Sequence, residues 1–483
     1  MKHKVVFKSI GTVLCIEAAS MLPSLVVALI NHEKAAIAFA LSIGIIAAIG
    51  AALMRIKTPI SRIFTRDGFA IVSLSWILVT LFGTLPFLLS GSIPSFIDAL
   101  FETASGFSTT GSSILTDVEA LPKSVLFWRS STHWLGGMGI LVLMIAILPS
   151  VSASTINIMI AESPGPAPGK VVPKIRETAK ILYSIYIFMT AVLVVLLLAG
   201  GMPLFDALIH AFGTASTGGF SSRNAGVSAY NSVYIEAVIT IFMFLFGVSF
   251  TLYYMILKRD IKSVLRDEEL RFYVGVVAAA IVLIVLSING TVYRSLGESV
   301  RYASFQVSSI ITTTGFATAD FNVWPTFSQI ILILLMFLGA CAGSTGGGIK
   351  CIRVILLLKI IKREIAKLNH PRAVQTVRIN GRRVEEETLS GVMAFFFFWM
   401  LIIAASSLLV SLEGKDPVTS VTAVIASISN IGPGLGLVGP MGNYAGLSAL
   451  SKVVLTICML VGRLEIYPIM LLCLPSFWKR SSI

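Results

Sequence analysis

The stretch ITTTGFATAD, residues 311–320, interrupts an apolar sequence with three consecutive threonines and one glycine. Related stretches occur at three other places: STTGSS at 108–113, STGGFSS at 216–222 and SNIGPG at 429–434. In the first two of these, an Asp-Ala-Leu sequence begins thirteen residues before the glycine. A single TTG or STG is typical of an ordinary turn or a helix contact made by small residues. Four such stretches in register instead predict a unit that is repeated four times.

The composition is that of a membrane protein. The 483 residues are 56% hydrophobic and only 13% charged, and the mean hydropathy is +0.90. About 20 apolar residues cross the roughly 30 Å hydrocarbon core of a bilayer, and we read about ten such segments along the chain. The chain is therefore expected to cross the membrane many times and to contact lipid.

The positive charges indicate the orientation. The formal net charge is +13, and most of the 37 lysines and arginines lie in segments that would share one side of the membrane, 1–10, 55–67, 151–180, 257–272, 350–383 and 479–483. Cytoplasmic loops of membrane proteins carry such an excess. We therefore expect a cytoplasmic-membrane protein with both termini in the cytoplasm, and the basic balance needs no nucleic acid as partner.

Each of the four glycines has the same surroundings: a long apolar segment, a short segment, the polar stretch, a connector and another long segment. The short segment has about eleven residues and would be roughly 17 Å long as a helix, half the membrane thickness. It must enter and leave on one side. Irregular backbone at membrane depth is tolerated only where protein shields it or water reaches it, so four such loops predict one shared pathway.

The expected fold is an all-α membrane protein with four covalently linked helix–pore loop–helix repeats in a pseudo-fourfold arrangement, preceded by two extra transmembrane helices. The expected ranges are 1–58 for the extra pair and 59–150, 151–262, 263–370 and 371–483 for the repeats.

The residue types in the loops suit a cation that has lost its water. Backbone carbonyls supply oxygen ligands without the desolvation of buried carboxylates. Glycine permits the positive φ angles that turn carbonyls toward an axis, and the C-terminal end of each short helix favours a cation. The sequence offers no clustered nucleophile, metal set or acid–base pair, so we expect no enzyme and no cofactor. The predicted filter comprises Thr109, Thr110, Gly111, Ser112, Thr217, Gly218, Gly219, Phe220, Thr313, Thr314, Gly315, Phe316, Asn430, Ile431, Gly432 and Pro433.

The sequence resembles the Trk/Ktr/HKT superfamily of potassium transporters, most closely its bacterial Trk-type membrane subunit. The resemblance rests on TTGSS, STGGF, TTTGF and NIGPG, and on WLGGMGI (134–140), GVSFTLYY (247–254), GACAGSTGGGIK (339–350) and GRLEIYP (462–468). It implies potassium as substrate, because a serine at one filter glycine marks the sodium-preferring plant branch and all four positions here are glycine. The implied potassium ligands are Thr110, Gly111, Gly218, Gly219, Thr314, Gly315, Ile431 and Gly432.

The resemblance further implies a homodimer and a cytoplasmic nucleotide-binding regulatory ring, sensitive to NAD or ATP, that docks on the inner face. Two departures from the family pattern indicate fewer ion sites than a potassium channel has: Ile431 stands where a hydroxyl residue is usual, and no TVGYG string is present.

The segment 339–350 lies inside a long apolar span and is rich in glycine and small polar residues, so it should break the helix. Close helix packing is the alternative explanation. The resemblance implies a gate below the filter, for which we name Gly343, Ser344, Thr345, Gly346, Gly347, Gly348, Lys350 and Arg463.

Two of these gate residues are basic. Arg463 lies deep in a predicted span, where a guanidinium is unfavourable, and it could bind the carbonyls of the gate or form an ion pair with Glu465 or Glu102. Lys350 could equally be an anchor at the membrane interface.

Other functions remain as alternatives. The chain could be a sodium/potassium symporter or a less selective monovalent cation transporter. An inverted-repeat secondary transporter would need repeats of opposite orientation. The charge pattern instead places all four glycine stretches on the outer side.

Overall fold

Long apolar helices alternate with short ones along the chain in a computed structural model, which describes residues 3–57, 65–139, 175–370 and 375–478. The expected boundaries at 58/59 and 150/151, most of the basic segment 151–180 and the last residue of WLGGMGI lie outside these residues.

The extra N-terminal helices form a close pair. Gly11 and Gly50 lie at their contact, where a Cβ on Gly11 would be 2.7 Å from the carbonyl oxygen of Gly50. Small residues of this kind let two membrane helices approach closely. The elements are α1 (His3–Ser20), which continues past Met21 into α2 (Leu22–Ile30), and α3 (Ala35–Met54).

Four groups of helices follow, and in each group one helix of 12 or 16 residues leads into a glycine stretch. We call these four the short helices, although the third is longer than the helix that follows it. The first has α4 (Thr65–Phe82), α5 (Leu85–Leu89), α6 (Phe96–Phe107) and α7 (Lys123–Gly137). The second has α10 (Ile175–Ala199), α11 (Leu204–Ala215), η2 (Gly226–Tyr230), α12 (Val233–Phe246) and α13 (Phe250–Leu257). The third has α14 (Ile261–Arg266), α15 (Glu268–Ile288), α16 (Leu296–Ile311), η3 (Phe321–Val323), α17 (Thr326–Leu338) and α18 (Cys351–Asn369).

The fourth group begins with a small hairpin. Its Asn-Gly turn has φ values of 48° and 77°, as a tight two-residue hairpin requires. The elements are β1 (Arg378–Ile379), β2 (Arg382–Arg383), α19 (Glu386–Ser411), α20 (Pro417–Ile428), η4 (Gly436–Val438), α21 (Ala449–Arg463), α22 (Tyr467–Cys473) and α23 (Pro475–Trp478).

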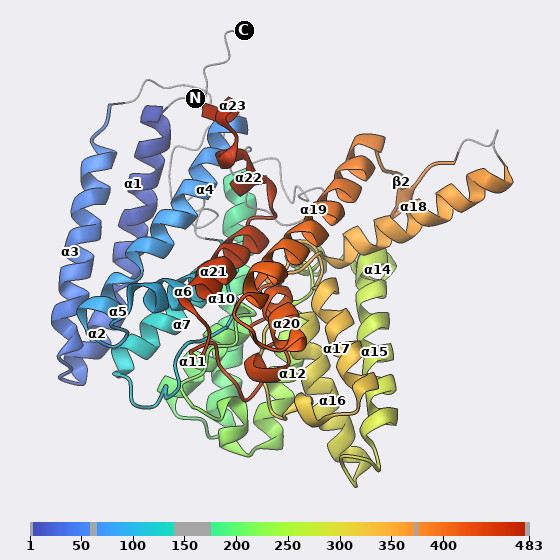
Figure 1. The fold of residues 1–483 in the computed structure, drawn as a ribbon, viewed down its shortest axis with the longest axis horizontal. Helices are drawn as coiled ribbons and strands as arrows, with labels where there is room; N and C mark the ends of the chain where they lie inside the picture. The colour runs from blue at the N-terminus through green and yellow to red at the C-terminus, as the bar shows by residue number, and fades with distance from the viewer. Residues whose placement is uncertain (1–2, 58–64, 140–174, 371–374, 479–483) are drawn as a thin grey trace.

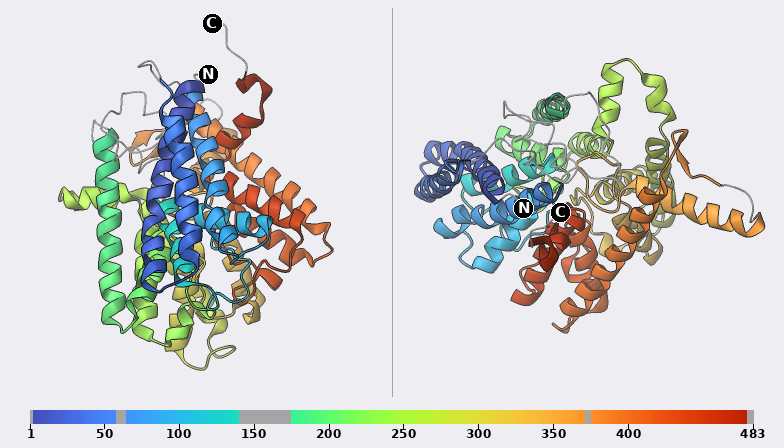
Figure 2. Two further views of the ribbon diagram at one scale, coloured as in Figure 1. Left: turned by 90° about the vertical axis from the view of Figure 1, so that its left-hand side faces the viewer. Right: turned by 90° about the horizontal axis from the view of Figure 1, so that it is seen from above.

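The four short helices pack in a closed ring. Each contacts the helices of its own group and the second long helix of the preceding group: α11 packs on α7, α16 on α12 and α20 on α17. The ring closes because α6, from the first group, packs on α21 from the last. Seen from above, the groups follow one another around the molecule in sequence order (Figure 2).

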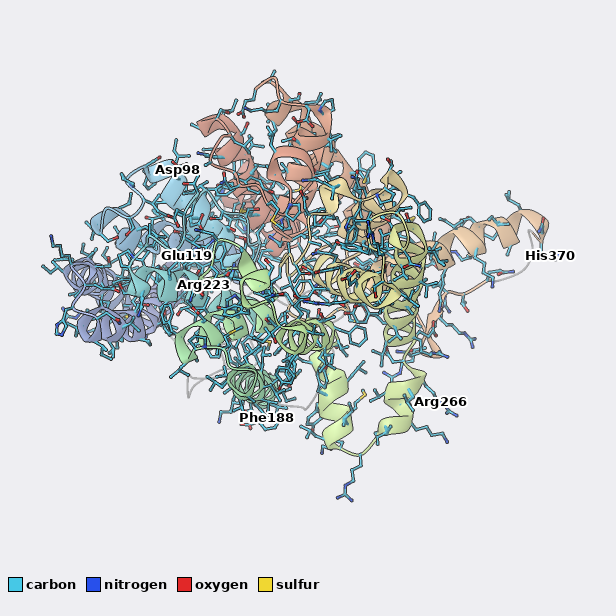
Figure 3. All side chains as sticks on the ribbon, turned by 90° about the horizontal axis from the view of Figure 1, so that it is seen from below. Asp98, Glu119, Phe188, Arg223, Arg266 and His370 are labelled. Atoms are coloured by element: carbon cyan, nitrogen blue, oxygen red, sulfur yellow. The ribbon has the colours of Figure 1, made fainter. Side chains whose placement is uncertain are left out.

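Two of the second long helices are interrupted. α12 and α13 are bent by 92° across residues 247–249. α17 ends at Leu338 and α18 begins at Cys351, so the predicted break of this span is confirmed. Beyond the break, α18 projects from the body of the molecule and ends near His370 (Figures 1 and 3).

The described helices suit a multi-pass membrane protein. Six are long and apolar enough to span a bilayer, or seven if the bent pair α12 and α13 is one span, and shorter apolar helices lie between them. Large apolar side chains such as Ile30, Phe188 and Leu286 are exposed on the outside, where lipid would cover them. α1 begins and α23 ends at the same end of the molecule (Figure 1).

Candidate functional site

The four short helices end in the same way. In α6 the amide of Thr109 donates to the carbonyl of Gly106 (3.1 Å) and that of Thr110 to Ser105 (2.9 Å), while Thr109 has φ 58°. This is a Schellman motif, in which the helix is closed by one residue in left-handed conformation. Thr217, Thr313 and Asn430 close α11, α16 and α20 with φ values of 56°, 62° and 55°.

A left-handed conformation is unfavourable for a β-branched side chain by about 1–2 kcal/mol. Three threonines nevertheless adopt it, and only the fourth copy uses asparagine, which tolerates it better. All four residues belong to the predicted filter, but the sequence predicted positive φ angles only for the glycines. The position two residues before each glycine was the available signal.

The four predicted filter glycines meet in a second closed ring. Each has positive φ, and beyond each Cα lies a carbonyl oxygen of the next loop. A Cβ on Gly111 would be 2.1 Å from the oxygen of Gly218, and one on Gly219 would be 2.1 Å from that of Thr314. The ring continues from Gly315 to Ile431 (2.0 Å) and from Gly432 to Thr110 (2.7 Å). The predicted filter residues therefore come together from four distant parts of the chain.

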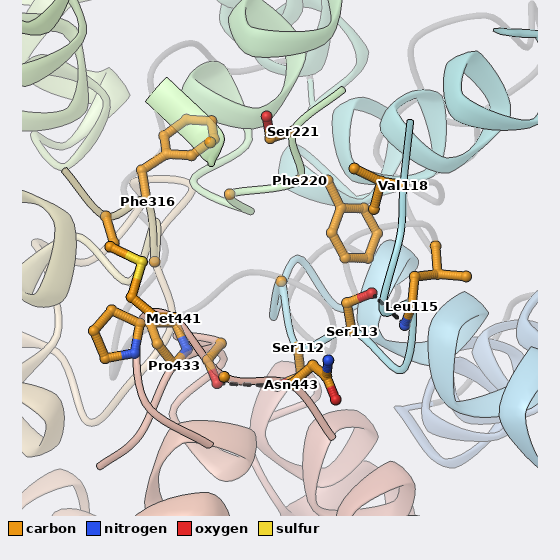
Figure 4. Close-up of a pocket in the computed structure, with 18 of the residues that line it drawn as sticks. Ser112, Ser113, Leu115, Val118, Phe220, Ser221, Phe316, Pro433, Met441 and Asn443 are labelled. Atoms are coloured by element: carbon orange, nitrogen blue, oxygen red, sulfur yellow. Dashed lines mark hydrogen bonds between the residues drawn. The ribbon is translucent and has the colours of Figure 1, made fainter. Parts of the chain in front are cut away.

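On one side of this ring, which we call its upper side, lies a cavity of about 230 Å³. It is lined by all four glycines and by the residues that follow them. Phe220 and Phe316 face it from the second and third loops, and Ser112 and Pro433 from the first and fourth (Figure 4). The Ser112 hydroxyl donates to the carbonyl of Gly432 (3.1 Å), and the Tyr444 hydroxyl donates to the same oxygen (2.6 Å).

Behind each loop, a buried side chain of the short helix forms a hydrogen bond with the segment that follows the glycine. The carboxylate of Glu102 accepts the amide of Ile114 (3.0 Å) and the hydroxyl of Ser113 (3.0 Å). In the second loop the ring of His210 contacts the Ser221 hydroxyl (3.1 Å).

The third and fourth loops are held in the same manner. With its side-chain amide turned to the orientation that satisfies its neighbours, Gln306 accepts the amide of Thr318 through its oxygen (2.9 Å). The hydroxyl of Thr422 accepts the amide of Leu435 (2.9 Å). These four side chains, Glu102, His210, Gln306 and Thr422, lie nine or ten residues before their glycines, and we call them the braces.

Glu102 does not act as a helix cap, although carboxylates near the start of a helix commonly do. It lies in the middle of α6 and contacts the loop, and the cap of α6 is Ser95. Asp98 forms an ion pair with Lys452 (2.6 Å), and Asp206 accepts the Ser222 hydroxyl (2.6 Å).

The predicted gate, residues 339–350, lies directly beneath the ring. The amide of Gly347 donates to the Thr313 hydroxyl (2.7 Å), and a Cβ on Gly347 would be 2.4 Å from the carbonyl oxygen of Ser429. A Cβ on Gly346 would be 2.9 Å from the carbonyl oxygen of Thr312. Glycine is required here because the loop presses against the ends of α16 and α20.

The two basic gate residues contact carbonyl oxygens. Arg463 donates to the carbonyl of Thr345 in the gate (3.0 Å), and to those of Gly136 and Gly137 at the end of α7 (2.6 Å to the latter). The two carboxylates considered as alternative partners of Arg463 form ion pairs with other arginines, Glu102 with Arg129 and Glu465 with Arg353.

Lys350 is buried, with 2% of its surface exposed, and it donates to the carbonyl of Gly346. The alternative of an anchor at the membrane interface is therefore wrong for Lys350.

Glu269 makes a further contact with the gate that the sequence did not indicate. A single carboxylate oxygen of Glu269, at the start of α15, accepts the amides of Ala342 (2.7 Å) and Ile352 (2.9 Å). Glu269 thus ties the first half of the loop to the helix that follows it. Its neighbour Glu268 pairs with Lys359 of α18 and accepts the amide of Asn380 in the hairpin (2.8 Å).

Known proteins resemble this chain over nearly its whole length. Residues 34–480 match the TrkH family of cation transport proteins. The Trk system potassium uptake protein TrkH of Halomonas elongata is 37% identical, over 99% of this chain and 100% of that protein. The Trk system potassium uptake protein TrkH of Escherichia coli (strain K12) is 36% identical over the same shares.

The fold agrees with these matches. The crystal structure of the potassium transporter TrkH from Vibrio parahaemolyticus aligns with a TM-score of 0.89 at 33% identity, covering 99% of this chain and 100% of that one. The expected resemblance and the all-α membrane fold are confirmed, and the family consists of transport proteins rather than enzymes. The chain belongs to the TrkH family of cation transport proteins.

Proposed function

We propose that this chain takes up potassium across the cytoplasmic membrane through a pore whose selectivity filter is the ring of four loops. The observation that carries the proposal is the closed ring itself, in which each glycine lies against a carbonyl oxygen of the next loop. Carbonyl rings replace the hydration shell of potassium in selective pores. The two TrkH relatives are named as potassium uptake proteins.

The proposed ligands are the backbone oxygens of the glycines and of the residues before them, Thr110, Gly111, Gly218, Gly219, Thr314, Gly315, Ile431 and Gly432. The four short helices direct their C-terminal ends toward the space below, where their partial negative charge would favour a cation. Potassium is the transported ion here, and we assign the chain no cofactor of its own.

We further propose that residues 339–350 close the pathway below the filter. Conduction would require the loop to leave the ends of α16 and α20, breaking the contacts of Gly347, Arg463 and Glu269. The guanidinium of Arg463 would also repel cations while it stays under the ring.

We also propose two partners, which the resemblance to Trk-type transporters implies. We propose a homodimer with one pore in each protomer, and a cytoplasmic nucleotide-binding ring that moves the gate. The hairpin β1–β2 and the basic helix α18, which reach outward from the gate, are the surfaces on which such a ring would dock. Both termini would then lie in the cytoplasm. Multi-angle light scattering of the detergent-solubilised protein tests the dimer.

The function is tested by ion flux into liposomes that contain the purified protein. With a potassium gradient alone we expect potassium entry, and with equal gradients of both ions we expect potassium to enter faster than sodium. Entry that requires a sodium or proton gradient would favour the symporter. Equal entry of both ions would favour an unselective transporter, and no flux with either would contradict the proposal.

A further inference from the structure

The brace of the first loop differs from the other three because it carries a full ion pair. Glu102 and Arg129 are both buried, with 1% and 3% of their surfaces exposed, and Arg129 Nε lies 2.5 Å from Glu102 Oε1. His210, Gln306 and Thr422 hold their loops without a basic partner at the matching position of the following helix. An ion pair withdrawn from water is retained only where its geometry is good and its remaining hydrogen-bonding groups are satisfied.

The position of Arg129 can be compared among the four groups. Arg129 is the seventh residue of α7, and the seventh residues of α12, α17 and α21 are Ile239, Leu332 and Leu455. All four side chains are buried. The fold therefore accepts an apolar side chain at this position in three groups out of four, so packing alone does not require an arginine in the first.

Arg129 connects two loops. Beyond its pair with Glu102, its Nη1 donates to the carbonyl of Ser221 in the second loop (3.2 Å). Its guanidinium lies over the ring of Phe220, with the central carbon 3.4 Å from the ring centroid. Both contacts lie within two residues of Gly219, and Arg129 also lines the cavity above the ring.

We infer that Glu102 and Arg129 form a positioning pair that fixes the first and second loops relative to each other and so sets how well the ring discriminates between potassium and sodium. The inference rests on the proposed function. Glu102 binds the segment after Gly111, and Arg129 binds the segment after Gly219. A guanidinium can bond a carboxylate and a carbonyl at once in fixed directions, which a point charge such as lysine cannot.

Glu102 also balances the positive charge that Arg129 brings to the cavity. A positive charge beside a cation pathway lowers the local cation concentration, and the carboxylate of Glu102 cancels it. The charge effect and the positioning effect predict different results for two variants, so they can be measured separately.

The single variant Glu102→Gln keeps the shape and one acceptor oxygen but leaves Arg129 without its counter-charge. The double variant Glu102→Gln with Arg129→Leu gives the first loop the side chains that the third loop has in Gln306 and Leu332. It removes the charge and the bond to Ser221 while it leaves a brace that the fold already uses. Asp98→Asn is the control, because Asp98 on the same helix forms its ion pair with Lys452 of α21 rather than with a loop residue.

The measurement is potassium and sodium flux into liposomes that contain each full-length variant, with the melting temperature as a check of folding. For Glu102→Gln we expect a raised KM for potassium. For the double variant we expect the KM to return toward wild type, while the potassium-to-sodium flux ratio falls about tenfold, the effect of losing one hydrogen bond to a charged group.

A double variant with the wild-type flux ratio would overturn the inference, as would an equal fall of the ratio in Asp98→Asn. If the wild-type protein itself passed no potassium, the proposed function would fail instead, so the two failures are distinguishable.

Discussion

At the scale of single residues, the ring depends on glycines whose missing side chains leave room for backbone oxygens. The space beyond the Cα of Gly315 is taken by the carbonyl of Ile431 at 2.0 Å and by the ring of Pro433 at 2.8 Å. Neither group is the end of a flexible side chain, so a substitution at Gly315 must displace the next loop. The positive φ of 77° adds strain for any other residue.

We therefore expect Gly315→Ser to reduce the potassium-to-sodium flux ratio by about tenfold, which corresponds to 1.4 kcal/mol of discrimination. The carbonyl oxygen of Ile431 would be displaced from the ring of carbonyl oxygens that we propose as potassium ligands. Ion flux into liposomes measures the ratio. Gly275→Ser in α15 is the control, because a Cβ there would meet no heavy atom within 4 Å. An unchanged ratio in Gly315→Ser would remove the case for discrimination by carbonyl groups.

Arg463 supports a second prediction at this scale. Arg463→Ala should raise potassium flux in the absence of any regulatory partner, because it removes the bond to Thr345 and a positive charge from beneath the ring. We expect a rise of about tenfold, since a hydrogen bond from a charged group contributes about 1.5–3 kcal/mol. Arg463→Lys keeps the charge and should have a smaller effect. Basal flux equal to that of the wild type would contradict a role of Arg463 in closure.

Residue-scale details of the site were only partly predictable from the sequence. The glycines were found because the same short pattern recurs four times. The braces were not predicted, because Glu102, His210, Gln306 and Thr422 are four different residue types. Only the fold shows that each forms a hydrogen bond with its own loop. Glu269 was missed because its two partners are backbone amides, which leave no mark in the sequence.

At the scale of elements, the break between α17 and α18 is held by contacts with neighbouring elements rather than by helical hydrogen bonds of its own. Glycines at 339, 343 and 348 have positive φ, which favours loop over helix. The contacts of the loop come from its surroundings: the amide of Cys341 donates to Gly247 (3.0 Å), and the amide of Phe250 donates to Gly343 (3.0 Å). The loop thus joins the bend between α12 and α13.

Glu269 gives a prediction at this scale. Glu269→Ala leaves the half-buried amides of Ala342 and Ile352 without their acceptor, which destabilises the closed loop by at most about 1–3 kcal/mol for each group. We expect a higher basal potassium flux at an unchanged potassium-to-sodium ratio, because the filter is untouched. Flux assays with both ions measure the two quantities. A lower ratio would mean that the loop shapes the filter. An unchanged flux would show that Glu269 does not hold the loop closed.

The elements themselves were largely predictable from the sequence. The short segments before each glycine became α6, α11, α16 and α20, and the glycine-rich segment became the break. The left-handed conformation at the ends of the short helices was harder to predict, because threonine is unfavourable in that conformation. Tertiary packing, which the sequence does not show, stabilises it there. The extension of α18 away from the body was likewise not evident from its composition.

At the scale of the whole molecule, the closed ring places the four groups around the axis in their sequence order. α6 of the first group packs on α21 of the last, although they are more than 300 residues apart. The contacts that form the ring of glycines also run in this order and return to Thr110. Each loop therefore contacts two neighbouring loops, and a substitution in one loop should displace the backbone of the others.

The central claim is that the four loops bind potassium on their shared axis. Anomalous X-ray diffraction from crystals grown with thallium in place of potassium tests it most directly. We predict a thallium peak between the four loops, within bonding distance of the carbonyl oxygens of residues 110, 218, 314 and 431. A map with no peak on this axis, from protein that transports thallium in liposomes, would contradict the account.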